Sequence, residues 1–367
     1  MKILHITPTL FPAVGGIETV VRELMGHLRR RGFEADAMHI ATGNRPMQER
    51  LDDSIVWRVP LYPNRLVGMA PSIRFILRQY DILHVHDPQL AAISGNVLVQ
   101  GRGQKKVLST HGGYRHTARH GWAKAAHWRW FAAPTLNQYD FILASSQSDY
   151  ELFRSRAAHV RLVPNGVNVE KFLSIEPAVD PDPKRWIYWG RLARNKRLDL
   201  LIELVAQARE RELRIDLLIA GHDFDGLEST LRARINALRL ENQVRLAGML
   251  SDAELMREVA NRTVFVTATE HEGFGLSVIE AMAAGLIALC RDMPPLNAFV
   301  SSGENGLLLR FDQSDSDLSL VQRLCASTAE EILRMRRNAR SSAHVHSWES
   351  AIEQYIDVYE ELMSGKP

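Results

Sequence analysis

The sequence predicts an α/β protein built from two domains, each with a doubly wound parallel sheet. Short apolar segments alternate with amphipathic helical segments along the whole chain, and this alternation is typical of parallel sheets covered by helices on both faces. The length of 367 residues is enough for two ordinary α/β domains. A segment rich in Pro, Asn and Gly interrupts the alternation near the middle of the chain.

The first half begins with an apolar strand over residues 2–7 and a helix over 16–31. Val20, Val21, Leu24 and Leu28 fall near one face of that helix. The other expected strands of this half are short apolar runs at 35–41, 55–59, 82–86, 106–111, 141–145 and 160–163.

The boundary is expected in the region of the turn-forming segments 164–168 and 177–183. We place the N-terminal domain at residues 1–170 and the C-terminal domain at 171–347. Strands of the second half are expected at 186–190, 216–221, 244–248, 264–267 and 286–290. A polar stretch, 338–347, precedes a last helix over 348–363.

Composition excludes several classes of protein. The formal net charge of +2 argues against a nucleic-acid-binding protein. The first residues form a short strand that meets Pro8, not a signal peptide, and no segment approaches the ~20 apolar residues of a membrane span. The two cysteines, Cys290 and Cys325, have no metal-binding spacing and fit a reducing compartment, so we expect a cytoplasmic protein.

A pair of glutamates, Glu272 and Glu280, carries the strongest functional signal. Glu272 lies in a loop after an apolar strand, and Glu280 lies two turns along the helix that the loop opens. Gly273 and Gly275 allow close approach of a ligand to backbone N–H groups at the helix start, a natural site for anions and hydroxyls. Either glutamate alone is as easily an acidic residue in an ordinary helix, but the whole pattern favours a ligand that is hydroxylated and phosphorylated.

A basic loop, Gly190 to Arg197, also follows a predicted strand and opens a helix. Arg191 and Lys196 could clamp a diphosphate through charge-assisted hydrogen bonds. The alternative is a solvated basic loop.

The run from Glu272 to Glu280 resembles the E-x7-E signature of retaining, nucleotide-sugar-dependent glycosyltransferases of family 4. The resemblance implies the GT-B fold, with two Rossmann-like domains facing across a cleft. It also implies that the last helix, 348–367, packs back on the N-terminal, acceptor-binding domain, and that the C-terminal domain binds the nucleotide sugar.

The resemblance also implies roles for individual residues. Arg191 and Lys196 would bind the donor diphosphate, with Gly15 and Gly16 in the first glycine loop, whose alternative role is a capped tight turn. Glu280 would bind the nucleoside through its ribose. The donor sugar would be held by Glu272, Gly273, Phe274 and Gly275, with Glu272 and His111 as the catalytic residues.

His111 ends a predicted strand, where ligands bind in open α/β sheets, although a lone histidine there is more often structural. In the family this histidine orients the sugar and stabilises charge near the anomeric centre. His84 and His86 end a neighbouring strand, and we expect them mainly to line the cleft or pack.

The sequence predicts no metal and no cofactor. No His, Asp or Glu cluster has the spacing of a metal site, and the Asp-x-Asp match at 180–182 lies in the expected linker. Arg191 and Lys196 would instead offset the charge of the leaving diphosphate.

Residues between Asp87 and Asp140 include no Asp or Glu and carry basic and aromatic side chains. Trp and cationic side chains together suit an anionic membrane surface or single-stranded nucleic acid, and the alternative is a solvated helix. We expect an acceptor-binding or membrane-facing surface here, made of Arg115, Arg119, Trp122, Lys124, Trp128 and Arg129.

Two segments, 111–117 and 292–295, also resemble a subgroup that adds mannose to polyprenyl-linked exopolysaccharide intermediates. The function expected is therefore metal-independent transfer of a sugar, best mannose from GDP-mannose, to a hydroxyl of a polyprenyl-diphosphate-linked saccharide. Another GT-B enzyme, such as an epimerase, or a nonenzymatic sugar- or lipid-binding scaffold are the alternatives. No nucleic-acid partner is expected.

Overall fold

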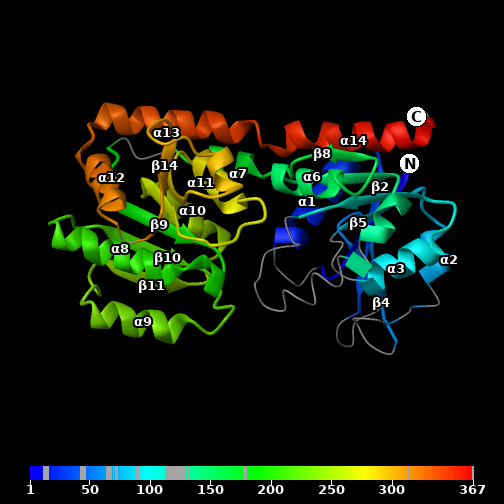
Figure 1. Ribbon diagram of the computed structural model, residues 1–367, viewed down its shortest axis with the longest axis horizontal. Helices are drawn as coiled ribbons and strands as arrows, with labels where there is room; N and C mark the ends of the chain where they lie inside the picture. The colour runs from blue at the N-terminus through cyan, green and yellow to red at the C-terminus, as the bar shows by residue number, and fades with distance from the viewer. Residues whose placement is uncertain are drawn as a thin grey trace. The chain divides into compact units, whose positions relative to one another are not determined.

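The computed structural model describes residues 1–10, 16–41, 47–62, 68, 70, 73–86, 91–111, 129–130, 133–176, 180–312 and 314–365. The chain forms two compact units (Figure 1). Unit 1 contains Met1–Gly166 and Trp348–Pro367, and unit 2 contains Val167–Ser347. The units thus separate at Gly166, before the residue 170 that we expected from the sequence.

Unit 1 is built on an eight-stranded sheet in the order β3-β4-β2-β1-β5-β6-β7-β8. Neighbouring strands pair in parallel, except β3 with β4. The order reverses between β1 and β5, which makes the carboxyl ends of these strands the switch point where ligands bind. The strands are β1 Lys2–Thr7, β2 Glu34–Ile40, β3 Gln48–Leu51, β4 Ser54–Val59, β5 Ile82–His86, β6 Lys105–Ser109, β7 Phe141–Ala144 and β8 Val160–Leu162.

Two helices from opposite ends of the chain, α1 and α14, pack together in unit 1 (Figure 1). Trp348, the first residue of α14, stacks on His27 of α1 with ring centroids 5.3 Å apart. Tyr355 and Tyr359 of α14 are also buried in this unit, so the last helix completes the core of the first domain. The helical elements are α1 Gly16–Arg30, α2 Ile73–Leu77, α3 Ala91–Gln100, α5 Ala133–Thr135, η2 Leu136–Gln138, α6 Gln147–Arg154 and α14 Trp348–Ser364.

Unit 2 is built on a six-stranded sheet in the order β11-β10-β9-β12-β13-β14. All its strand pairs are parallel. The order reverses between β9 and β12, so the loops after these two strands meet at the switch point of the second sheet. The strands are β9 Arg185–Trp189, β10 Asp216–Ala220, β11 Val244–Gly248, β12 Val264–Thr267, β13 Ile287–Arg291 and β14 Gly306–Leu309.

Helices cover both faces of this second sheet, because β9 sends alternate side chains to two hydrophobic clusters. Trp186 and Tyr188 pack with α8 and α12, whereas Ile187 and Trp189 pack with α7 and α11. The helical elements are α7 Val169–Leu173, η3 Arg194–Lys196, α8 Leu198–Glu210, α9 Glu228–Ala237, α10 Asp252–Ala260, α11 Leu276–Ala283, η4 Leu296–Ala298, α12 Asp315–Ala326 and α13 Ala329–His344.

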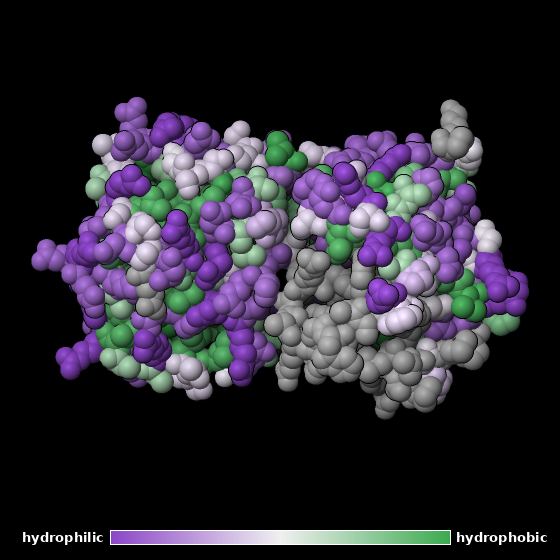
Figure 2. Space-filling model, in the orientation of Figure 1, coloured by the Kyte–Doolittle hydropathy of each residue, from purple (hydrophilic) through white to green (hydrophobic). Residues whose placement is uncertain are grey.

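The observed architecture confirms the predicted fold class of two parallel-sheet α/β domains. Most of the polar stretch 338–347 continues helix α13, whose Ala339 and Ala343 are buried. The described residues on the face shown in Figure 2 are mainly hydrophilic. Within the ranges given above, no helix is both long enough and apolar enough to span a bilayer.

Candidate functional site

The loop after β9 presents Arg191 at the surface of unit 2. The Tyr188 hydroxyl donates a hydrogen bond to the carbonyl oxygen of Arg191 over 3.0 Å. The exposed guanidinium lies 4.8 Å from the ring centroid of Phe224. The backbone N–H of Phe224 donates to Leu192 over 3.1 Å, so the loop after β10 is fixed beside this arginine.

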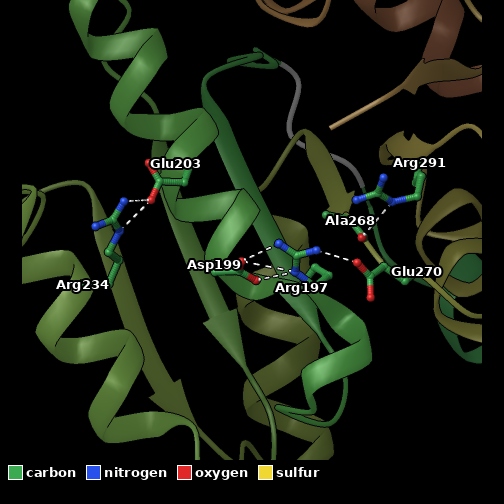
Figure 3. Close-up of polar contacts among 7 residues, drawn as sticks. All are labelled: Arg197, Asp199, Glu203, Arg234, Ala268, Glu270 and Arg291. Atoms are coloured by element: carbon green, nitrogen blue, oxygen red, sulfur yellow. Dashed lines mark hydrogen bonds and ion pairs between the residues drawn. The ribbon is translucent and has the colours of Figure 1, made fainter. Parts of the chain in front are cut away.

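Asn195 joins the loop after β9 to the loop after β12. Its carbonyl accepts from the backbone N–H of Glu270 over 2.8 Å, and its side-chain amide donates to the carbonyl of His271 over 3.2 Å. Arg197, which pairs with Asp199 and Glu270, adds a second connection between the same loops (Figure 3). The two loops that sequence analysis selected independently are therefore one structural unit.

This connection brings Lys196 and Glu272 together. Lys196 Nζ lies 2.7 Å from Glu272 Oε2, and the two side chains are only 14% and 18% exposed. Partial burial strengthens such an ion pair and fixes both groups. An ammonium and a carboxylate thus stand together beside the start of α11.

The N-terminus of α11 is shaped by Gly275, which is its N-cap and has a left-handed φ of 94°. The backbone conformation therefore requires glycine, and a Cβ at this position would also lie 2.9 Å from Leu296 Cδ2, so that side chain would have to shift. The first intrahelical donors to the Gly275 carbonyl are Val278 and Ile279, and the N–H groups before them point out of the helix end. Phe274 is 6% exposed and packs edge-on against Phe299 and His346, so its backbone, not its ring, is suited to a ligand.

Glu280 lies on α11. This helix follows β12, the neighbour of strand β9, and β9 leads into the basic loop. Its Oε2 accepts a hydrogen bond from Trp189 Nε1 over 3.2 Å. Burial raises the pKa of Glu280 from 4.5 to about 7, against a smaller lowering by the Trp189 hydrogen bond. A carboxylate held in this way is a strong acceptor for hydroxyl groups.

Two predicted donor-site residues of unit 1, Gly16 and His111, are among the described residues. Gly16 is the first residue of α1, and Gly15 lies outside the described residues. His111 follows β6, and its Nε2 lies 3.0 Å from Nδ1 of His86. Burial lowers the pKa of His111 to about 4, so the imidazole is neutral at pH 7.

A buried histidine cluster behind His111 was not predicted from the sequence. His5, His84 and His86 offer nitrogen atoms within 4.8 Å of one another, a grouping that could hold a metal ion. We expected no metal site because no cluster has metal-ligand spacing along the sequence, and this grouping comes together only through the sheet of unit 1. Both ring nitrogens of His84 are hydrogen-bonded, to Tyr359 Oη at 2.6 Å and to Ser109 Oγ at 2.7 Å. The one signal in the sequence was the presence of histidines near equivalent positions of β1 and β5, two strands that are neighbours in the sheet.

Unit 2 also contains Asp-x-Asp pairs that sequence analysis overlooked. At 223–225, Asp223 accepts from the backbone N–H groups of Leu227 and Glu228 at 2.7 and 3.1 Å. Its partner Asp225 accepts from the N–H of Arg194 over 2.8 Å. At 315–317, Asp317 likewise accepts from two backbone N–H groups, those of Arg310 and Phe311. These carboxylates cap the ends of helices and loops.

Most of the basic, aromatic segment of unit 1 lies outside the described residues, including Arg115, Arg119, Trp122, Lys124 and Trp128. Arg129 is described and exposed, and its guanidinium lies 5.5 Å from the ring centroid of Trp130. Trp130 is 76% exposed.

Comparison with known families accounts for nearly the whole chain. Residues 170–342 match the family model "Glycosyl transferases group 1", and residues 14–171 match "Glycosyltransferase Family 4". These matches cover every strand except β1 and include both predicted site loops of unit 2.

Similar proteins of known activity include the GDP-mannose:cellobiosyl-diphosphopolyprenol alpha-mannosyltransferases of Xanthomonas oryzae and Komagataeibacter xylinus. Each is 29% identical over 99% of this chain, and the alignments cover 97% and 94% of those proteins.

Similar solved structures share the architecture at lower identity. Sucrose-phosphate synthase from Thermosynechococcus elongatus superposes with a TM-score of 0.79 at 20% identity, covering 100% of both chains. Anabaena HepE in complex with UDP and glucose superposes with a TM-score of 0.76 at 17% identity, covering 98% of this chain and 100% of the other. The chain therefore belongs to the group 1, family 4 glycosyltransferases and is a glycosyltransferase of the GT-B fold.

Proposed function

We propose that the protein transfers mannose from GDP-mannose to a polyprenyl-diphosphate-linked saccharide, with retention of configuration and without a metal ion. The proposal rests on one observation: the elements that meet at the switch point of the second sheet carry Arg191, Lys196, Glu272 and Glu280. Two cations, two carboxylates and a helix N-terminus match a ligand that is diphosphorylated and hydroxylated. The choice of donor and acceptor rests on the full-length relatives, which are GDP-mannose-dependent enzymes that act on cellobiosyl-diphosphopolyprenol.

Each group has a distinct task in this proposal. Arg191 and Lys196 bind the diphosphate and stabilise its charge as the glycosidic bond breaks. Glu280 accepts hydrogen bonds from the ribose hydroxyls, and Glu272 accepts them from the sugar. His111 orients the donor sugar near the anomeric carbon.

The chemical step needs no protein nucleophile. Breaking of the bond to the diphosphate runs ahead of formation of the new bond, and a diphosphate oxygen accepts the proton of the acceptor hydroxyl. The new bond forms on the face from which the diphosphate leaves, so an α-linked donor gives an α-linked product.

Metal independence is supported by how the acidic residues of unit 2 are used. Asp223 and Asp317 each accept two backbone N–H groups, and Asp225 accepts one. If these carboxylates bound Mg²⁺ instead, the backbone N–H groups that donate to them would lose their acceptors. The diphosphate charge is instead offset by Arg191 and Lys196.

The deciding experiment offers the purified protein GDP-mannose, GDP-glucose, UDP-glucose and UDP-N-acetylglucosamine with a cellobiosyl-diphosphopolyprenol analogue. We expect turnover with GDP-mannose, undiminished by EDTA, and an α-linked mannose in the NMR spectrum of the product. A β-linked product would refute retention, and activity restored only by Mg²⁺ or Mn²⁺ would refute metal independence. Donor consumption without a new glycosidic bond would favour an epimerase-like enzyme, and no turnover of bound donor would favour a scaffold.

The acceptor proposal implies a membrane surface at unit 1. An exposed Trp130 beside Arg129 is the arrangement expected at a lipid headgroup, where each basic side chain contributes roughly 1 kcal/mol. We expect weak, reversible binding to vesicles of anionic phospholipid, lost in a variant with serine at four basic positions. Co-sedimentation at low salt tests this, and equal binding by both proteins would redirect the search to acceptors in solution. The four positions are Arg115, Arg119, Lys124 and Arg129.

A further inference from the structure

The basic loop of unit 2 ends at a residue with an unusual backbone conformation. Arg197 joins η3 to α8 with a φ of 48° and a ψ of 50°, in the left-handed region. A residue other than glycine adopts this conformation at a cost, because its Cβ lies too close to the next carbonyl oxygen. Strain of this kind persists only where the surrounding structure holds it, and it clusters at functional sites. We therefore expect Arg197 to make a contact that glycine, which adopts the same backbone without cost, could not make.

The guanidinium of Arg197 bridges two carboxylates from different segments (Figure 3). Its Nε lies 3.0 and 3.2 Å from the two carboxylate oxygens of Asp199, and its Nη2 lies 2.8 Å from one of them. Its Nη1 donates to Glu270 Oε1, in the loop after β12. Because Asp199 lies in the first turn of α8, it fixes the planar guanidinium and leaves one further donor for Glu270.

The bridge from Arg197 to Glu270 joins the same two loops as the ion pair between Lys196 and Glu272. Lys196 immediately precedes Arg197, and Glu272 follows Glu270 by two positions. The side chains of Arg197 and Glu270 are 33% and 43% exposed, so their ion pair contributes little to the stability of the whole unit. Its effect is therefore local: it limits how far the two loops can move apart.

We propose that Arg197 is a positioning residue for the donor site, which holds Lys196 beside Glu272 by binding Glu270. This inference rests on the proposed function, in which Lys196 and Glu272 bind the donor. Without the bridge, the two loops also adopt spacings at which these side chains do not meet one ligand. The donor then binds only the fraction of molecules with the correct spacing, so its apparent affinity falls by that fraction. Once bound, the diphosphate holds Lys196 itself, so the loss appears in KM and not in kcat.

Two substitutions at Arg197 separate the side-chain contact from the backbone conformation. Glycine and asparagine both tolerate a left-handed φ, and both are too short to bridge the two carboxylates. The loop after β12 keeps other contacts, because the Asn195 amide donates to the carbonyl of His271 and Arg291 Nε donates to the carbonyl of Ala268. We therefore expect Arg197→Gly and Arg197→Asn to fold and to melt within about 4 °C of the wild type.

The first readout is hydrogen exchange of the Glu270 backbone amide in the full-length protein, which requires no donor. This N–H donates to the Asn195 carbonyl over 2.8 Å, and its exchange should become about 3- to 10-fold faster in both variants. The second readout is steady-state kinetics with GDP-mannose, in which KM should rise by about 3- to 10-fold while kcat stays within about twofold. In a Lys196→Ala background, Arg197→Gly should raise KM by less than about twofold, because a positioning residue acts only through its target.

Arg234 provides a matched control, because its guanidinium also binds a carboxylate through two nitrogens, that of Glu203, but it joins helices α9 and α8 (Figure 3). Arg234→Ala should leave both the donor KM and the exchange of the Glu270 amide unchanged. The proposal would be overturned by unchanged exchange in Arg197→Gly, by an unchanged KM despite faster exchange, or by additive losses in the Lys196→Ala background. Normal donor binding by Lys196→Ala alone would instead refute the proposed donor site, and the exchange rates would still decide whether Arg197 holds the loop.

Discussion

Replacing Glu280 with glutamine should stabilise the folded protein at pH 8 and weaken donor binding. Burial raises the pKa of Glu280 from 4.5 to about 7, a rise of roughly 2.5 pH units. At about 1.36 kcal/mol per pH unit, keeping this carboxylate ionised costs roughly 3 kcal/mol as an upper limit. Glutamine has the same shape, carries no charge and can still accept the Trp189 hydrogen bond.

The sign of the pH dependence follows from the raised pKa. Between pH 4.5 and about 7 the folded state binds more protons at Glu280 than the unfolded state, so the wild type loses stability as pH rises through this window. Above the folded-state pKa the loss is complete. The difference between Glu280→Gln and the wild type should therefore grow from pH 4.5 to pH 7 and then stay constant.

Thermal melting at each pH measures the effect, which we expect to reach up to about 6–12 °C at pH 8. Glu330→Gln provides a control, because it replaces an exposed glutamate of the same unit in the same way. Calorimetric titration with GDP should show binding weakened by roughly 10- to 100-fold in Glu280→Gln. A loss of this size is expected when a hydrogen bond to a charged group is removed. A melting difference that does not change with pH would refute the raised pKa, and unchanged GDP affinity would refute the ribose contact.

Three further outcomes are expected in unit 2. Arg191→Ala and Lys196→Ala should each lower donor affinity or turnover by about 2–5 kcal/mol, and normal kinetics in the double variant would remove both from the diphosphate site. Phe224→Ala should raise the donor KM about 2- to 5-fold by releasing Arg191, whereas Phe224→Tyr should retain it; equal KM values in steady-state assays would contradict this. Gly221→Ala should prevent unit 2 from folding normally, because its Cβ would lie 1.7 Å from the Gly190 carbonyl oxygen; a wild-type melting curve would disprove the contact.

The sequence predicted those parts of the fold that local patterns determine. Strands at 82–86, 244–248 and 264–267 have the predicted bounds, because each is a compact apolar run between turn signals. The antiparallel strand Gln48–Leu51 was missed because it is polar and pairs only at the sheet edge. Helix α13 was not predicted because its exposed face is highly charged, while its buried alanines give a weak periodic signal.

In the candidate site, too, local patterns predicted single residues but not the contacts between distant segments. Glu272 and Glu280 could be found because their spacing is local, and Lys196 because it follows a predicted strand. Their hydrogen-bonded connection through Asn195 could not be found, because it depends on which strands are neighbours. The buried histidine cluster was missed for the same reason: β1 and β5 lie side by side, but His5 and His86 are 81 positions apart in the chain.

The return of α14 to unit 1 has a consequence for synthesis on the ribosome. Unit 2 is one uninterrupted segment, Val167–Ser347, whereas unit 1 needs both Met1–Gly166 and Trp348–Pro367. The second unit can therefore complete its core while the first still lacks the helix that buries Trp348, Tyr355 and Tyr359. Although domains that emerge first usually fold first, here the N-terminal domain can complete its core only after α14 has been synthesised. A nascent chain stalled before residue 348 should accordingly be held by chaperones through its first domain, not its second.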